Sequence, residues 1–259
     1  GGKVQSLYSR HYQAPVLYEN PAGGMFPMLP LANRVAGNRF IFQGREIVLP
    51  RHHADAHFFL HGDGWLQRWD MIARGGDYCV LQLRRQHACG FDYLAQIRYQ
   101  LLRNQLVAAL TLTHCGSTPI PYGCGFHPFF PFDKRGTVQF AAAGYWPEGE
   151  QHLPLGWQGQ LPGDADFSHA QYGEDRWLNV GYSGWSGRAR VSSDVMDITI
   201  LSQTPWLMLF RMQGEPFLCL EPQSHPVNAH NMDGQPGLRV LGAGDTLSFS
   251  LKIDVQGRE

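Results

Sequence analysis

"TLSFSLKIDV", from Thr246 to Val255, alternates polar and apolar residues without a break. Successive side chains of a β-strand point to opposite faces of a sheet, so this alternation predicts a strand with one buried and one solvated face. The 3.6-residue period of a helix would scatter the same residues around its circumference. The stretch therefore indicates a sheet that covers a hydrophobic core.

Similar runs recur along the chain, which contains 30 Gly and 17 Pro and shows little helical periodicity. "RFIFQGREIVLP" (39–50) predicts two strands around a Gln-Gly turn. Further strands are expected at 78–86, 106–115, 189–202, 206–212 and 216–222. So many short strands separated by turn signals predict an all-β fold, a large antiparallel β-sandwich. No repeat or linker divides the chain, so we expect one domain over residues 1–259.

The composition excludes several classes of function. The chain has 259 residues, 43% of them hydrophobic and 17% charged, with a net charge of −1, which indicates a globular protein. There is no basic footprint for nucleic acid, no polybasic patch and no apolar run of the ~18 residues needed to cross a membrane. The five cysteines form no CxxC pair, which fits a reducing compartment, and no signal peptide is visible. We therefore expect a cytoplasmic protein.

One segment without a clear period runs from Glu148 to Gln171. It predicts a long loop, and long ordered loops often carry binding groups.

A histidine, His127, stands inside the aromatic stretch "PYGCGFHPFFPF" (121–132). Pro128 follows it and biases its backbone toward an extended conformation. Phenylalanines on both sides would surround the imidazole with apolar groups. The ring is either a core histidine satisfied by hydrogen bonds or one held dry and rigid for chemistry.

Three histidines in "HHADAHFFLHGDGW" (52–65), His53, His57 and His61, are spaced four residues apart. On a helix they would share a face and suggest a metal site, but the phenylalanines and glycines do not fit a helix. No carboxylate or cysteine stands at a familiar ligand spacing, so we predict no metal here. We expect instead a strand that enters a Gly-rich turn, with His61 at its end and directed into a site.

Asn33 and Arg34 follow an apolar run in "MFPMLPLANRVAGNRF" (25–40). Such an arginine is either a surface charge or, with its asparagine neighbour, a hydrogen-bonding unit for hydroxyl groups, because a guanidinium presents five donors in a rigid fork.

A carboxylate, Glu221, ends an apolar strand in "FLCLEPQSHPVNAHN" (217–231). It is either solvated or paired, or else it is partly buried with a raised pKa and prepared to act as a general base near neutral pH. Gln223, His225 and Asn228 follow, and they are placed to orient Glu221 or to bind a ligand.

Taken together, these stretches resemble the aldose 1-epimerase (galactose mutarotase) family. The matching segments are Asn33–Arg34, "LHGDGW" (60–65), "GFHPFFP" (125–131), "YSGWSGRAR" (182–190) and "LEPQSHPVNAHN" (220–231). They occur in the order of the family and span nearly the whole chain, and the most similar proteins are bacterial members of unassigned substrate. The strand that usually opens the family's fold is expected to be missing before "GGKVQSL".

The resemblance implies a β-sandwich whose open concave face holds a small-molecule sugar, without metal or cofactor, in a monomer or homodimer. His127 would be the general acid and Glu221 the general base. The sugar-binding residues would be Asn33, Arg34, His61, Asn179 and Gln223. Asn179, in "LNVGYSGW", stands where the family often has an acidic residue, and its uncharged amide is expected to alter sugar preference or affinity.

The implied reaction explains these residue types. Mutarotation removes a proton from the anomeric hydroxyl and delivers one to the ring oxygen, so an acid and a base on opposite sides of the sugar suffice. We expect His127 to be protonated and Glu221 ionised near neutral pH. A dry aromatic surround alone would favour a neutral His127, so a carboxylate or carbonyl nearby must offset it.

Three other hypotheses stay open at this point. A hexose-6-phosphate 1-epimerase would need basic residues at the rim of the site, for which Arg39, Arg45 and Arg51 are candidates. A carbohydrate-binding module could use the same sandwich without turnover. A purely structural sandwich would have to match the five ordered segments by coincidence.

Overall fold

The computed structural model describes residues 1–258, and every paired strand in that part of the chain is antiparallel. Residues 1–258 contain no α-helix and only four short 3₁₀ turns, η1 (Ala36–Asn38), η2 (Gly64–Leu66), η3 (Glu150–His152) and η4 (Ala229–Asn231). None of these turns has the length or apolar character of a membrane-spanning helix. The predicted all-β fold is confirmed.

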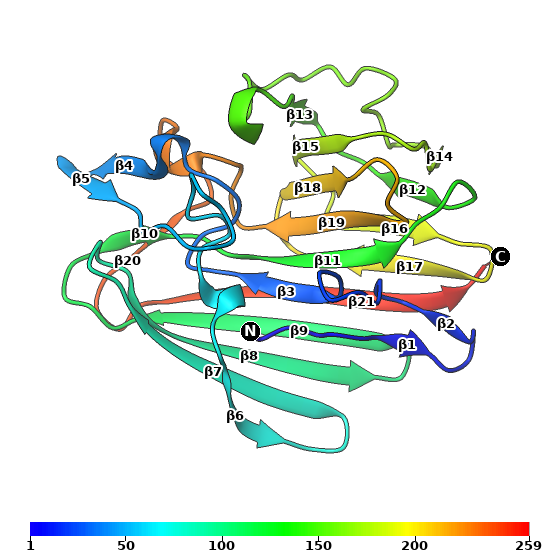
Figure 1. Cartoon of the computed structure of the whole chain (residues 1–259), viewed down its shortest axis with the longest axis horizontal. Coiled ribbons are helices and arrows are strands. Elements are labelled where there is room, and N and C mark those ends of the chain that lie inside the picture. The colour runs from blue at the N-terminus through cyan, green and yellow to red at the C-terminus, as the bar shows by residue number, and fades with distance from the viewer. Residues whose placement is uncertain (259) are drawn as a thin grey trace.

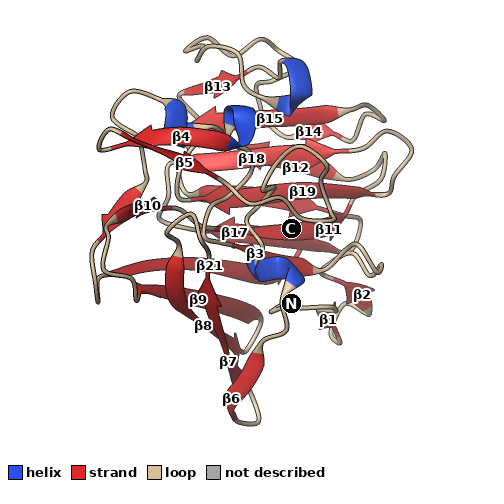
Figure 2. Ribbon diagram, turned by 60° about the vertical axis from the view of Figure 1, so that its left-hand side comes forward, coloured by secondary structure: helices blue, strands red, loops and turns tan. Residues whose placement is uncertain are grey.

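Two large sheets form a sandwich (Figures 1 and 2). The smaller sheet has six strands, in the order β13 (Gly144–Trp146), β15 (Leu178–Ser183), β18 (Trp206–Arg211), β19 (Phe217–Gln223), β11 (Gly125–Pro131) and β3 (Met25–Met28). The larger sheet has nine, in the order β14 (Gln171–Tyr172), β12 (Thr137–Phe140), β16 (Arg188–Ser192), β17 (Met196–Leu201), β21 (Thr246–Gly257), β9 (Gln105–His114), β8 (Asp92–Leu102), β7 (Tyr78–Gln86) and β6 (Asp70–Arg74).

Three two-stranded ribbons complete the fold. They pair β1 (Tyr8–Ser9) with β2 (Ala14–Pro15), β4 (Arg39–Phe42) with β5 (Arg45–Val48), and β10 (Ile120–Tyr122) with β20 (Arg239–Leu241). The β4–β5 hairpin turns at Gln43 and Gly44, both with positive φ, as the Gln-Gly turn predicted.

Most predicted strands are present, with two differences. The run 189–202 forms two strands, β16 and β17, because Ser193 turns the chain by accepting a hydrogen bond from the Met196 amide to its hydroxyl. The prediction of a strand within 52–65 is wrong. The segment is a loop, because His61 and Gly62 adopt positive φ values of 59° and 64°. A Cβ on Gly62 would lie 2.1 Å from the carbonyl oxygen of Leu29, so only glycine fits this close approach.

The alternation of β11 determines what each face of the smaller sheet carries. Phe126 and Phe130 enter the main hydrophobic core with the residues of the larger sheet. His127 and Phe129 point the other way, and Phe129 joins a second apolar cluster with Phe26 and Cys219. The face of the smaller sheet turned away from the larger sheet therefore presents His127.

Candidate active site

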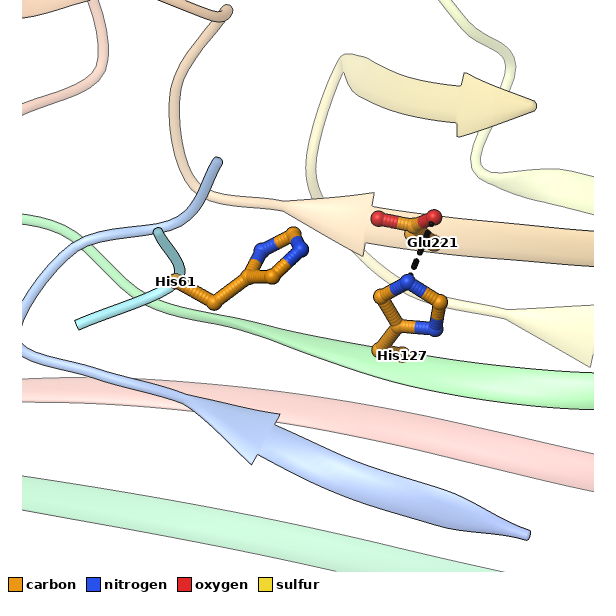
Figure 3. Close-up of side chains that lie close together, drawn as sticks. All are labelled: His61, His127 and Glu221. Carbon is orange, nitrogen blue, oxygen red and sulfur yellow. Dashed lines mark ion pairs between the residues drawn. The ribbon is translucent and has the colours of Figure 1, made fainter. Parts of the chain in front are cut away.

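His127 on β11 and Glu221 on β19 meet as cross-strand neighbours. The register pairs Gly125 with Gln223 and Phe129 with Cys219, which places the two residues opposite each other between these pairs. His127 Nε2 lies 3.0 Å from Glu221 Oε1, and the two residues are only 6% and 2% exposed. Figure 3 shows the imidazole and the carboxylate directed toward each other from adjacent strands. We call these two residues the acid–base pair.

Neighbouring side chains hold the acid–base pair in position. The imidazole of His127 stacks against Phe26 and Phe129, whose ring centroids are 4.5 Å and 4.7 Å away. Glu221 accepts a hydrogen bond of 3.2 Å on its second oxygen from Gln223 Nε2. Neither reactive group can rotate without losing a specific contact, which is the preorganisation that proton transfer requires.

Burial determines where the shared proton lies. It raises the pKa of Glu221 to about 8 and lowers the pKa of His127 to about 3. Burial therefore favours a protonated carboxyl beside a neutral imidazole in the free protein, the reverse of the expected protonated His127 with ionised Glu221. The expected carboxylate neighbour is present, but burial is the largest influence on the pKa values of both residues. Moving one proton from Glu221 to His127 gives the ion pair without changing the number of bound protons.

Two hydrogen bonds join His61 to the backbone of Asn33. The His61 amide donates to the Asn33 carbonyl at 3.0 Å, and the Asn33 amide donates to His61 Nδ1 at 3.1 Å. Burial, with smaller effects of His127 and Arg34, lowers the pKa of His61 well below its ordinary value. The ring is therefore neutral, and because Nδ1 accepts, the proton is on Nε2. His61 thus offers a hydrogen-bond donor beside His127, whose ring centroid is 5.2 Å away.

His61, His127 and Glu221 have ligand atoms within 4.8 Å of one another, a spacing that could hold a cation. Coordination through His61 Nε2 would require this nitrogen to lose the proton that its hydrogen bond to Asn33 leaves there. The arrangement is better suited to hydroxyl groups than to a metal. His53 and His57 are exposed and are not part of this group, so the four-residue spacing does not assemble a metal site within residues 1–258.

A cavity of about 580 Å³ lies over the acid–base pair, a size typical of small-molecule sites. Its polar lining includes both members of the pair with Asn33, Arg34, His61, His152 and Asn179, and its aromatic lining is Phe26, Trp65, Phe129, Trp177 and Phe210. The Arg34 guanidinium donates to the side-chain oxygen of Asn33 at 3.3 Å and carries a permanent positive charge.

The remaining predicted residues support the site from outside the cavity. Gln223 contacts Glu221 and is not part of the cavity lining, so its sugar-binding role stays a prediction. His225 Nε2 accepts from the Ala32 amide at 3.1 Å, and the Asn228 amide donates to the Arg34 carbonyl at 2.9 Å. Both residues fix the loop that carries Asn33 and Arg34. The arginines considered for a phosphate, Arg39, Arg45 and Arg51, do not line the cavity.

Several residues of the site were not predicted. Trp177 and His152 line the cavity, and Glu148 accepts a hydrogen bond of 2.6 Å from Asn179. Glu148 and His152 come from the segment predicted as a binding loop, and no periodicity in that segment indicates which residues turn toward β15.

The fold and the site together define a β-sandwich protein that places a buried acid–base pair beneath a cavity suited to a hydroxylated ligand. The sequence profile of the family described as aldose 1-epimerase matches residues 1–254. The chain is 35% identical over 244 residues to the uncharacterised protein YphB of Escherichia coli K12, covering 89% of this chain and 83% of the relative. The chain belongs to the aldose 1-epimerase family.

Solved structures agree with this placement. A crystal structure from Escherichia coli K12, provisionally described as an aldose 1-epimerase, superposes with a TM-score of 0.94 at 30% identity, covering 99% of this chain and 93% of the other. Galactose 1-epimerase from Lactobacillus acidophilus superposes with a TM-score of 0.78 at 17% identity, covering 100% and 90%. The second likeness shows the shared fold.

Proposed function

We propose that this chain is an aldose 1-epimerase that interconverts the α and β anomers of an aldohexose or a related sugar. The observation that carries the proposal is the 3.0 Å contact between His127 Nε2 and Glu221 Oε1 at the cavity surface. Perturbed pKa values of a buried acid and base in a cavity are typical of catalytic sites. Family membership supports the same reaction.

The reaction uses the two protonation forms of the pair in turn. In the ion-pair form, Glu221 removes the proton of the anomeric hydroxyl while His127 delivers its proton to the ring oxygen, and the bond between the anomeric carbon and the ring oxygen breaks. The open-chain aldehyde is left beside the neutral pair. After rotation about the C1–C2 bond, the ring oxygen attacks the other face of the aldehyde, and both protons return. The protein ends with the same number of protons as at the start.

The other side chains bind and polarise the sugar. The positive charge of Arg34 favours the ionised form of Glu221, which counteracts its burial and supports the reactive form. Asn33 and His61 supply hydrogen-bond donors for sugar oxygens. Trp65 and Trp177 offer aromatic surfaces on which the C–H face of a sugar can stack.

The arginines considered for a phosphate group do not support a hexose 6-phosphate, and the Lys and Arg side chains that line the cavity are Lys3 and Arg34. Arg39 is exposed and forms an ion pair of 3.2 Å with Glu46, and Arg45 and Arg51 also lie outside the cavity lining. A non-catalytic sugar-binding module would gain nothing from burying an acid and a base in contact, because their burial destabilises the fold.

The test follows the optical rotation of freshly dissolved α-D-glucose, α-D-galactose and α-D-glucose 6-phosphate, with EDTA present. We expect the wild-type protein to accelerate the equilibration of the anomers of at least one unphosphorylated hexose. Acceleration of the phosphorylated sugar alone would replace it with a hexose-6-phosphate 1-epimerase. No acceleration of any sugar would overturn it.

A further inference from the structure

The carboxylate of Glu148 accepts hydrogen bonds from three side chains, one in its own loop and two at or near the start of β15. It accepts hydrogen bonds from Asn179 Nδ2 at 2.6 Å, from Trp177 Nε1 at 2.7 Å and from His152 Nδ1 at 2.5 Å. All three donors belong to residues that line the cavity, whereas Glu148 does not line it. Glu148 lines the adjoining pocket together with His152 and Asn179, and it contacts all three residues directly.

The contact with Glu148 fixes the orientation of the Asn179 amide. A side-chain amide has one end that donates and one that accepts, and only the donating nitrogen can face a carboxylate without repulsion. The side-chain oxygen of Asn179 has no hydrogen-bond partner within residues 1–258, and the residue lines the cavity. Asn179 therefore offers the cavity an acceptor, as the acidic residue expected from the family resemblance would.

The same carboxylate fixes the ring of His152. This ring also packs against Trp177, with centroids 5.6 Å apart. His152 and its neighbour Gln151 both have positive φ, of 61° and 55°, which is unfavourable for residues other than glycine. A strained turn at the wall of a cavity, held in place by side-chain contacts, is typical of functional sites.

We propose that Glu148 is a positioning residue that orients Asn179 and His152 for sugar recognition and thereby determines which sugar hydroxyls are accepted. The inference rests on the proposed function. A sugar hydroxyl that donates to the oxygen of Asn179 is the group this arrangement selects. A sugar lacking that hydroxyl leaves a buried acceptor unpaired and binds less well.

Exchanging the carboxylate of Glu148 and the amide of Asn179 tests the proposal. Glu148→Gln weakens the hold on Asn179 and is expected to raise KM by about 3–10-fold, with kcat within about 3-fold of wild type, because the acid–base pair is untouched. Asn179→Asp places two carboxylates in contact and is expected to raise KM further. The double variant Glu148→Gln/Asn179→Asp restores one amide and one carboxylate in contact, so KM should return to within about 3-fold of wild type.

Glu150→Gln is the matched control. Glu150 belongs to the same turn, is exposed, and its side chain has no hydrogen-bond partner within residues 1–258, so its KM should equal that of wild type. Unchanged KM in Glu148→Gln, or no recovery in the double variant, would overturn the inference while leaving the epimerase activity of the wild type standing.

A direct binding measurement separates this inference from the proposed function. If the wild type does not accelerate anomer exchange, the proposed function fails. Calorimetric titration of the same variants with D-galactose and D-glucose then decides the inference. Weaker binding by Glu148→Gln and recovery in the double variant would support it. The absence of binding by the wild type, or equal dissociation constants in wild type, Glu148→Gln and Asn179→Asp, would overturn it.

Discussion

His127 Nε2 and Glu221 Oε1 lie 3.0 Å apart on adjacent strands, and both side chains are almost completely buried. At this distance the two groups share a proton, so their titrations belong to the pair and not to either residue alone. The lower pKa, about 3, and the higher pKa, about 8, then bound the range in which the pair holds a single shared proton.

The pH dependence of kcat/KM should be a plateau bounded by these two values. Above about 8 the shared proton is lost and nothing can protonate the ring oxygen; below about 3 a second proton binds and no base remains. We expect a flat profile from about pH 4.5 to about pH 7, as far as the protein stays folded, and a tenfold loss per pH unit well above pH 8. Rates of anomer exchange, corrected for catalysis by buffer and hydroxide, give this profile. A rise through pH 8 would contradict a shared catalytic proton.

Replacing Glu221 by glutamine should stabilise the protein at high pH. Burial raises the pKa of Glu221 in the folded state, so stability falls as the pH increases from the unfolded pKa near 4.5 to about 8. At about pH 5 the protonated carboxyl and a glutamine amide are nearly equivalent, and the free energies of unfolding should match. At about pH 9 the variant should be more stable by about 2–4 kcal/mol. Urea unfolding at the two pH values measures the difference, and a variant that is less stable at pH 9 would contradict the account.

His61→Asn should separate the two functions of the His61 ring. The Asn oxygen can replace Nδ1 as acceptor for the Asn33 amide, and Asn tolerates the φ of 59° at this position. The variant loses only the Nε2 donor, so we expect KM to rise about 3–10-fold with stability within about 1 kcal/mol of wild type. His61→Leu, which loses both functions, is the comparison. Equal KM for wild type and His61→Asn would show that the Nε2 donor does not contact the sugar.

Asp63 fixes the His61 loop to the larger sheet. Its buried carboxylate accepts from Arg85 Nη2 at 2.5 Å and from Gln67 Nε2 at 3.2 Å, and His87 Nε2 lies 3.3 Å away. Burial alone would raise the pKa of Asp63, but His87 and Arg85 outweigh it and lower the pKa. The stability that Asp63 contributes is therefore present above its unfolded pKa and lost as the pH falls through the lowered value.

Asp63→Ala should accordingly destabilise the protein by about 2–3 kcal/mol at pH 7, since it leaves Arg85 and His87 without their partner. Asp63→Asn keeps a side-chain oxygen that accepts hydrogen bonds, so it should destabilise the protein less than Asp63→Ala does. Both variants should raise KM more than they lower kcat, because the loop that presents His61 loosens while the acid–base pair stays in place. Thermal unfolding and anomer-exchange kinetics measure the two effects. Unchanged unfolding temperatures would show that the loop is fixed by other contacts.

The fold could be predicted from the sequence because its strands alternate cleanly. The pattern at 246–255 corresponds to β21, and the bounds predicted for β7 are those observed. β8 was not predicted although Tyr93, Ala95, Ile97 and Tyr99 are buried at every second position. The strand predicted within 52–65 failed because the conformation of that loop depends on its packing against Leu29, a contact that no local pattern encodes.

The candidate site was only partly predictable. His127, Glu221, His61, Asn33 and Arg34 were candidates from the residue pattern, but their roles came from the family resemblance, since periodicity alone does not show that His127 and Glu221 face each other. The contact between Glu148 and Asn179 joins an irregular loop to β15 across 31 residues of sequence, so no spacing rule reveals it. The protonation of the pair depends on burial, which residue type and order do not specify.

The most direct test of the account compares anomer exchange by wild type, Glu221→Gln, His127→Asn and the double variant, with folding checked by circular dichroism. Two residues that share one proton act as a unit, so each single variant should lose about 10²–10⁴-fold in kcat, and the double variant should lose little more than either one. If Glu221→Gln or His127→Asn keeps kcat within about tenfold of an active wild type, the pair is not the catalytic centre and the account is wrong.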